Sequence, residues 1–526
     1  MKKRLHNIML AGTGSDVGKS IIATALCRIF LQDGYTPAPF KAQNMALNSF
    51  ATKEGLEIGR AQAVQAEAAG VECHTDMNPL LLKPQSDHTS QVILNGKPIG
   101  VSSAYSYFRK EGKEELRQAV QAAFDRLSER YNPIVMEGAG SVSELNLAET
   151  DIVNLPMACY ANADVFLVAD IDRGGVFASA YGSIALQKEE YRKLIKGIII
   201  NKFRGDLRLF ESGKKILEQR CGVPVLGVIP YYKDIYIEEE DSVDLAAKSF
   251  SRERGKINVA VILLRHISNF TDFNVLERDE RVHLYYTSNT EDIKKSDIII
   301  LPGTKSTIAD LYELRKNGCA QAVISAFRNG ASVLGICGGY QMMGESIEDP
   351  NGIEGDITYL PGLGLLPVKT TITGEKITRQ TSFKLNGIPS EKYLTGYEIH
   401  MGETTLTATA ATSGSTENRT KTKDDNLNKE PSVAVGGKSV TRLAILEDGT
   451  AEGFAKGRKC MGCYLHGILD NREFIDYLLE PFKDKCKERG GAEDYTAFKQ
   501  RQYDLLAEHI RKNLDMNLLY KIISND

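Results

Sequence analysis

Short apolar runs alternate with amphipathic stretches over the first 230 residues of the chain. Runs of this length, rich in β-branched residues and bounded by polar or glycine positions, are typical of buried strands. They occupy residues 8–11, 134–136, 165–169, 198–200 and 225–229. Helices are predicted between them, over residues 20–32, 57–69 and 104–130. This alternation predicts βαβ units around a parallel sheet, in a first domain over residues 1–235.

A second α/β pattern begins at residue 257. It follows a charged, polar stretch over residues 236–256 that lacks apolar periodicity and is predicted to be a linker. Strands are predicted at residues 259–264, 298–301 and 332–336, and helices at residues 308–316 and 320–328. The second domain is predicted over residues 257–475. The sequence therefore predicts an α/β protein with two doubly wound, mostly parallel-sheet domains.

Two further segments do not fit this alternation. Residues 404–438 are rich in Thr, Ser, Asn and Lys and carry almost no large apolar residue, which predicts a mobile insertion in the second domain. From residue 471 the chain becomes helical and charged, with periodic stretches at residues 474–479 and 503–518. We predict a C-terminal helical appendage over residues 476–526.

Composition restricts the classes of function. The chain has 526 residues, of which 42% are hydrophobic and 25% charged, as in ordinary globular proteins. Lys and Arg number 65 against 69 Asp and Glu, a net charge of −4, so no global positive field attracts nucleic acid or an anionic membrane. Nine cysteines, with no export signal and no apolar run of membrane-spanning length, predict reduced thiols in the cytoplasm.

A glycine-rich segment follows the first predicted strand and opens the first predicted helix. Its glycines allow backbone N–H groups to converge on phosphate oxygens at a helix N-terminus. Lys19 is predicted to contact the β- and γ-phosphates, and the Ser20 hydroxyl to bind Mg²⁺. Thr13 stands where the strict phosphate-loop pattern has its first glycine, which indicates a subgroup. The predicted ATP-binding residues are Gly12, Thr13, Gly14, Ser15, Asp16, Val17, Gly18, Lys19 and Ser20.

Polar residues also follow the later predicted strands of this domain. They are Glu137, then Asp170, Asp172 and Arg173, and then Asn201. Because the carboxyl ends of parallel strands meet at one edge of a sheet, these side chains are expected near the phosphates. Glu137 is predicted to be the second Mg²⁺ ligand, with a capping or structural glutamate as the alternative. Asn201 is predicted to contact adenine, and a plain turn asparagine fits equally well.

A glycine-flanked cysteine lies between a predicted strand and a predicted helix in the second domain. A sharp strand-to-helix turn needs small neighbours, and it places the thiol at a helix N-terminus, where the dipole favours a thiolate. Cys337 is therefore a predicted nucleophile, with a buried packing cysteine as the alternative. His466 is the predicted base. The backbone amides of Gly303 and Gly338 are predicted to form an oxyanion hole.

One pair of cysteines has the spacing of a metal motif. Cys460 and Cys463 form a single C-x-x-C segment with no second pair in register. One such segment is poor evidence for zinc. We therefore predict structural thiols and assign no metal here.

These residues resemble known families. The cysteine turn with His466 resembles class I glutamine amidotransferases. The phosphate loop carries Gly14 where ATPases that position DNA have a second lysine, and it resembles the loop of the dethiobiotin synthetase group. Longer strings are similar to the cobyric acid synthases, glutamine-dependent amidases of the cobalamin pathway. These strings are residues 40–49, 57–62, 77–84, 169–177, 267–273 and 396–402.

The resemblance implies glutamine-dependent amidation of the b, d, e and g carboxylates of adenosylcobyrinic acid a,c-diamide, giving adenosylcobyric acid with ATP consumed for each amide. It implies ATP and Mg²⁺ as cofactors, without zinc, flavin or NAD, and small-molecule partners: glutamine, ATP and a corrinoid acid. The nearest alternative is a cobyrinic acid a,c-diamide synthase of the same architecture. A non-catalytic phosphate-loop switch would have no use for the cysteine turn.

The resemblance also implies roles for individual residues. Gln341 is expected to bind the substrate glutamine. The substrate or nucleotide side is expected to include Lys41, Gln43, Asn44, Asp170, Asp172 and Arg173. Ile468 replaces the glutamate that usually lies two residues after the histidine, so a Cys337 and His466 dyad is predicted. Candidates to orient the histidine are Glu398, His400 and Asp470.

Overall fold

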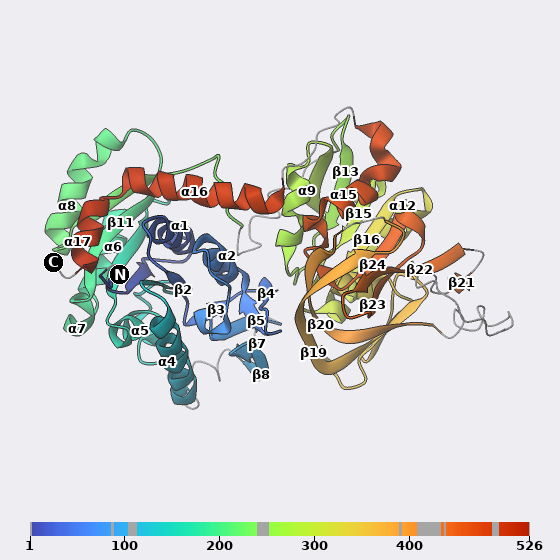
Figure 1. Ribbon diagram of the computed structural model, residues 1–526, viewed down its shortest axis with the longest axis horizontal. Helices are drawn as coiled ribbons and strands as arrows, with labels where there is room; N and C mark the ends of the chain where they lie inside the picture. The colour runs from blue at the N-terminus through green and yellow to red at the C-terminus, as the bar shows by residue number, and fades with distance from the viewer. Residues whose placement is uncertain are drawn as a thin grey trace. The chain divides into compact units, whose positions relative to one another are not determined.

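The chain forms two compact units (Figure 1). The first combines Met1–Ala46, Leu56–Glu240 and Thr496–Asp526, and the second combines Leu47–Gly55 and Asp241–Tyr495. This computed structural model describes residues 3–85, 89–103, 113–238, 252–388, 392–407, 433–435, 438–486 and 494–524. Most of the predicted linker over residues 236–256 and most of the predicted insertion over residues 404–438 lie outside the described residues.

A six-stranded parallel sheet forms the centre of the first unit. Its order is β12 (Val225–Pro230), β11 (Ile195–Phe203), β10 (Asp164–Asp170), β1 (Ile8–Gly12), β9 (Ile134–Glu137) and β2 (Ala38–Phe40). All its pairs are parallel. The five predicted strands are confirmed, whereas β2 is a three-residue strand containing Pro39 and was not predicted. The loops that follow the central strands therefore open at one edge.

Helices connect these strands. They are α1 (Lys19–Gln32), α2 (Arg60–Ala68), α4 (Lys113–Arg130), α5 (Leu155–Tyr160), α6 (Val176–Ala185), α7 (Glu189–Arg192) and α8 (Glu211–Cys221). The helix predicted from residue 57 begins at Arg60 because Glu57–Gly59 is extended as β5. A four-stranded sheet was not predicted; it contains β3 (Gln43–Met45), β6 (Leu80–Pro84), β7 (Thr89–Leu94) and β8 (Lys97–Ser103).

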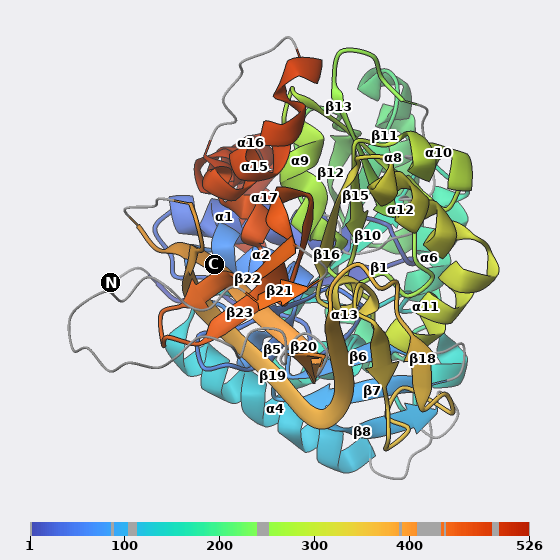
Figure 2. The same cartoon turned by 90° about the vertical axis from the view of Figure 1, so that its right-hand side faces the viewer.

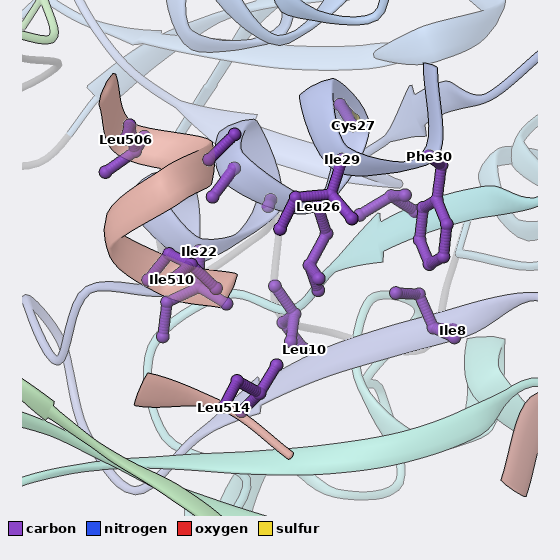
Figure 3. Close-up of a cluster of buried hydrophobic side chains, with 14 of the residues drawn as sticks. Ile8, Leu10, Ile22, Leu26, Cys27, Ile29, Phe30, Leu506, Ile510 and Leu514 are labelled. Atoms are coloured by element: carbon purple, nitrogen blue, oxygen red, sulfur yellow. The ribbon is translucent and has the colours of Figure 1, made fainter. Parts of the chain in front are cut away.

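The C-terminal helices belong to the core of the first unit. Leu506 and Ile510 of α16 (Tyr495–Asn513) lie in one cluster of buried side chains with Ile22 of α1 (Figure 3). The single helix predicted over residues 503–518 is two helices. The Asp515 carboxylate accepts from Leu518 N at 2.9 Å and caps α17 (Met516–Ile523). The sequence alone did not assign residues 496–526 to this unit.

We expect Leu506→Ala to lower the free energy of unfolding of the first unit by about 2–5 kcal/mol, the usual cost of emptying a well-packed leucine site. Leu506 is 0% exposed, whereas its neighbour Leu505 is 39% exposed. Leu505→Ala is therefore the matched control, with an expected change within about 0.5 kcal/mol. Urea unfolding followed by circular dichroism measures both. Equal effects of the two substitutions would contradict the packing described.

The second unit contains a larger mixed sheet (Figure 2). Its parallel part runs β14 (Val282–Thr287), β13 (Ile257–Ile262), β15 (Ile298–Leu301), β16 (Ser332–Ile336) and β24 (Cys460–Cys463). The sheet continues through antiparallel strands β23 (Ala451–Ala455), β22 (Lys438–Leu446) and β19 (Val368–Leu385). Strand β19 also pairs with β20 (Leu394–Leu406), which pairs with the short β25 (Leu465–His466).

Helices again flank the parallel strands of this unit. They are α9 (Asn274–Arg278), α10 (Thr290–Lys295), α11 (Thr307–Lys316), α12 (Cys319–Arg328), α13 (Gly338–Met342) and α15 (Arg472–Leu479). The helices predicted at residues 308–316, 320–328 and 474–479 are confirmed. Within the described part of the chain, no helix is both long and apolar enough to span a membrane.

Candidate active sites

The phosphate loop connects β1 to α1 in the first unit. Lys19 is 7% exposed, and its Nζ donates to Gly14 O at 3.0 Å and to Gly140 O at 3.1 Å. A Cβ on Gly12 would lie 2.7 Å from Lys19 Nζ and 2.9 Å from Gly140 O. Only glycine fits at residue 12, which explains why the first glycine stands one position early. The loop holds a buried ammonium group at the N-terminus of a helix, as phosphate binding requires.

Glu137 is the centre of a buried polar cluster beside this loop. Its Oε1 accepts from Ser20 Oγ at 2.8 Å and from Lys41 Nζ at 2.9 Å, and its Oε2 accepts from Gln65 Nε2 at 2.8 Å. Burial raises the pKa of Glu137, but the Lys41 ammonium and the hydrogen bonds from Lys41, Gln65 and Ser20 outweigh it and leave the pKa lowered. Glu137 is therefore a buried carboxylate whose charge is balanced by Lys41.

The donor set of this cluster fits Mg²⁺. The Ser20 hydroxyl and the Glu137 carboxylate are hydrogen-bonded to each other and are hard oxygen donors of the kind this ion prefers. Gln65 Oε1 is buried and has no hydrogen-bond partner among the described residues. This amide oxygen is a further polar group that a hydrated ion or its water can satisfy. The two predicted ligands, Ser20 and Glu137, thus lie together as expected.

Other predicted residues of the first unit form contacts at the same edge. Asn201 Nδ2 donates to Val17 O at 2.9 Å, so its amide anchors the phosphate loop. Asp170 is paired with Lys202 Nζ at 3.1 Å, and its Oδ1 accepts from Asp172 N at 2.8 Å. At the same edge, the predicted residue Arg173 is 3.6 Å from Asp16, and Asp172 is paired with Arg204, which was not predicted, at 2.8 Å.

The predicted string from Lys41 to Asn44 divides between two surroundings. Lys41 joins the Glu137 cluster. Asn44 is 2% exposed, and its Nδ2 donates to Gln62 Oε1 at 3.2 Å. Gln43 is half-buried on β3. Lys41 is thus the member of this string that the structure places at the phosphate-loop cluster.

Cys337 occupies a strained turn between β16 and α13 in the second unit. Its φ is 52° and its ψ is −113°, outside the conformations that side chains favour. A Cβ on Gly339 would lie 1.9 Å from Leu301 O, and one on Gly335 would lie 2.5 Å from Met343 Sδ. The glycines that predicted the turn are therefore required by close packing on both sides of the cysteine. Cys337 is 8% exposed.

His466 lies against this cysteine and is held by a carboxylate that was not predicted. His466 Nδ1 is 2.7 Å from Asp272 Oδ2, and Gly467 N donates to Asp272 Oδ1 at 3.2 Å. Burial lowers the pKa of His466, but Asp272 and contact with the Cys337 sulfur outweigh it and raise the pKa to about 10. The Cys337 thiol, the His466 imidazole and the Asp272 carboxylate thus contact one another in a row, which is the arrangement of a catalytic triad.

The structure places Asp272 at His466 Nδ1, rather than one of the three predicted orienting residues. Glu398 is bound by Arg379. His400 stacks on Tyr464, with ring centroids 3.6 Å apart, and burial lowers its pKa to about 3. Asp470 is the last residue of the η7 turn, Ile468–Asp470. Of the two histidines near Cys337, only His466 has the raised pKa of an imidazolium.

The predicted oxyanion and glutamine residues surround the same turn. A Cβ on Gly303 would lie 3.4 Å from His466 Cε1, and one on Gly338 would lie 3.2 Å from Thr304 N, so both glycines lie close to the pair. Gln341 is 2% exposed. Its Nε2 donates to Met401 O at 2.9 Å, and its Oε1 accepts from Thr307 at 3.1 Å. Gln341 therefore supports the loops around the turn.

The two cysteines of the C-x-x-C segment lie on β24. Both are buried, and residues three apart on a strand point to opposite faces. Burial raises the pKa of Cys460 to about 12 and that of Cys463 well above its usual value. Their surroundings favour neutral thiols.

Known protein families match both units. A CobQ/CobB/MinD/ParA nucleotide binding domain matches residues 8–243, and a CobB/CobQ-like glutamine amidotransferase domain matches residues 258–474. The chain is 65% identical over 526 residues to a cobyric acid synthase of Phocaeicola vulgatus, with 100% of each chain covered. The chain belongs to the cobyric acid synthase family. Cobyric acid synthases of Bacteroides fragilis and Parabacteroides distasonis are 64% and 54% identical to it, again over 100% of each chain.

Membership of the cobyric acid synthase family confirms the resemblance drawn from the six strings. The chain is therefore an enzyme, a ligase with a nucleotide-binding domain and a glutamine amidotransferase domain. The alternative of a non-catalytic phosphate-loop switch is wrong.

Sequence reasoning missed two residues of this cobyric acid synthase family member. Asp272 lies in the string 267–273 that carried part of the resemblance, but its separation from His466 along the chain concealed their contact. The signal was a carboxylate shortly after β13, at the carboxyl edge that also carries Cys337. Gln65 lies on α2, one turn beyond the string 57–62, and helical spacing alone did not indicate that it faces Glu137.

Proposed function

We propose that this chain amidates the b, d, e and g carboxylates of adenosylcobyrinic acid a,c-diamide, giving adenosylcobyric acid in cobalamin biosynthesis. The observation that carries this proposal is the division of chemistry between two units. The first unit holds a buried lysine and an ionised glutamate at a phosphate loop. The second unit holds a thiol that contacts an imidazole, which in turn contacts a carboxylate. The relatives named cobyric acid synthase support the choice of substrate.

The first unit activates the acid. A carboxylate is a poor electrophile, and an oxygen of the corrinoid carboxylate attacks the γ-phosphorus of ATP, forming an acyl phosphate as ADP departs. Lys19 neutralises charge on the transferred phosphoryl group. Mg²⁺, when bound, would be held by Ser20 and Glu137 and would supply further neutralisation of phosphate charge. Lys41, paired with Glu137, is proposed to lie on the substrate or nucleotide side of this site.

The second unit releases nitrogen. The Cys337 sulfur attacks the side-chain carbonyl carbon of glutamine, and the carbonyl oxygen is stabilised by the amides of Gly303 and Gly338. His466 donates a proton to the departing ammonia, which leaves a glutamyl thioester on Cys337. Water then hydrolyses the thioester with His466 as base. Ammonia attacks the acyl phosphate, so phosphate leaves and the amide forms.

Asp272 is proposed to position His466 and to hold it in the protonated state. We expect Asp272→Asn to lower glutamine hydrolysis by about 10²–10⁴-fold, because an amide can fix the wrong imidazole tautomer. Since Asp272 raises the pKa of His466, its loss lowers that pKa. The alkaline limb of the pH profile of glutamine hydrolysis is therefore expected to move to lower pH. Glutamate release measured across pH tests this, and an unchanged profile would contradict it.

Mass spectrometry of the product tests the proposed substrate. Incubation of the protein with glutamine, ATP, Mg²⁺ and adenosylcobyrinic acid a,c-diamide is expected to convert the b, d, e and g carboxylates to amides. A parallel incubation with cobyrinic acid tests the alternative of an a,c-diamide synthase. Amidation of cobyrinic acid only at positions a and c, with no reaction of the a,c-diamide, would overturn the proposal.

A further inference from the structure

A short segment of the N-terminal half is built into the second unit. Leu47–Gly55 belongs to the second unit, although the residues on either side, up to Ala46 and from Leu56, belong to the first. Ser49 and Ala51 are buried, at 1% and 0% exposed. The Ala51 carbonyl accepts from Gln380 Nε2 at 2.9 Å. The segment is therefore an integral part of the unit that carries Cys337.

The backbone of this segment contacts the turn that carries Asp272. Ser49 N donates to Asn269 Oδ1 at 3.0 Å. Asn269 has a φ of 51° and is the N-cap of the one-turn 3₁₀ helix Phe270–Phe273, which contains Asp272. Asn269 Nδ2 also donates to the Tyr397 hydroxyl at 3.3 Å. The Ser49 amide thus fixes the side chain that joins the Asp272 turn to Tyr397.

The side chain of the next residue contacts Tyr397 directly. The Phe50 and Tyr397 rings meet edge to face, with centroids 4.8 Å apart. Tyr397 in turn stacks on the imidazole of His466, with centroids 5.2 Å apart and an angle of 20° between the rings. Ala51, Tyr397 and Ile399 form one buried cluster with Phe50 packed against it. Phe50 and the Ser49 amide therefore support both groups that determine the position of His466.

We propose that the Ser49 amide and Phe50 are positioning groups of the glutaminase site, supplied by the ATP-binding half of the chain. The inference rests on the proposed function of Cys337 and His466. The same stretch of chain begins at Lys41, which is paired with Glu137 at the phosphate loop.

The experiment compares two substitutions at Ser49 and one at Phe50. Ser49→Pro removes the N–H donor to Asn269, whereas Ser49→Ala keeps it and is the matched control. Phe50→Ala removes the ring that contacts Tyr397, and Phe50→Leu is the conservative variant expected to restore part of the support. Each variant is assayed for glutamate release, and for amidation with glutamine or with ammonium chloride as the nitrogen source.

We expect Ser49→Pro and Phe50→Ala to lower kcat for glutamate release by about 10- to 100-fold, because small displacements of catalytic groups cost this much. Ammonia-dependent amidation by the same variants should stay within about twofold of the unsubstituted protein. Ser49→Ala should match the unsubstituted protein, and Phe50→Leu should fall between it and Phe50→Ala. The pH profile of glutamate release should also shift in Ser49→Pro, since Asp272 is loosened.

Two results would overturn the inference. One is an unchanged kcat for glutamate release in both Ser49→Pro and Phe50→Ala. The other is an equal loss with glutamine and with ammonia, which would indicate general damage to the fold. Glutamate release is measured without corrinoid as well. Failure of the proposed corrinoid substrate would therefore appear as absent amidation in the unsubstituted protein and leave the test of Ser49 and Phe50 intact.

Discussion

Replacing Cys337 with serine is expected to abolish glutamine-dependent amidation and to leave ammonia-dependent amidation intact. The strained turn holds the Cys337 sulfur in contact with His466, and the raised pKa of His466 keeps a positive charge beside it. A serine hydroxyl keeps the size of the group but is a far weaker nucleophile at neutral pH. Loss of the nucleophile is expected to lower glutamine-dependent turnover on the order of 10³-fold or more.

The control for this substitution is another buried cysteine of the same unit. Cys319 is 0% exposed at the start of α12 and bonds Ser288 O rather than a residue of the Cys337 turn. Cys319→Ser is expected to retain glutamine-dependent turnover. Amide formation with each nitrogen source is measured for both variants. Equal loss of both nitrogen sources in Cys337→Ser would contradict the separation of the two sites.

Replacing Lys19 with alanine is expected to remove amidation with both nitrogen sources. The Lys19 ammonium is buried between Gly14 O and Gly140 O, in the loop where the phosphates of ATP are proposed to bind. Without it, charge that develops on the transferred phosphoryl group has no fixed partner, and losses of about 10²–10³-fold are usual for one such donor. The expected result is loss of ATP hydrolysis and amide formation, with basal glutamate release by Cys337 retained.

Lys215→Ala provides the comparison, because Lys215 is an exposed lysine on α8 of the same unit. We expect it to leave all activities unchanged. Ammonia-dependent amidation at the normal rate in Lys19→Ala would show that the acid is activated without the phosphate loop.

Local sequence signals predicted the phosphate loop and the cysteine turn, the two segments in which close packing requires glycine. At residues 12, 335 and 339 there is no room for a Cβ, so only glycine fits. The glycines themselves were therefore the sequence signal that predicted these turns. Glu137 was predicted for a related reason, because it ends a buried strand and the carboxyl ends of parallel strands converge.

Contacts between distant parts of the chain could not be predicted in this way. The pairing of Asp272 with His466 joins residues far apart in sequence, and no local pattern marks either as the other's partner. The packing of α16 against α1 is equally non-local, since Leu506 and Ile510 lie far along the chain from Ile22, with which they share one buried cluster. Strand β19 was missed because its long polar, half-exposed stretch lacks the apolar run of a buried strand.

Transfer of labelled nitrogen is the most direct test of the central claim that one unit releases ammonia for an acid activated by the other. The protein is given glutamine labelled with ¹⁵N in the side-chain amide, ATP, Mg²⁺ and adenosylcobyrinic acid a,c-diamide, with unlabelled ammonium present below the level that supports turnover. Mass spectrometry of the corrinoid is expected to show ¹⁵N in every new amide, and none after Cys337→Ser. New amides without the label, or labelled amides formed without ATP, would contradict the account.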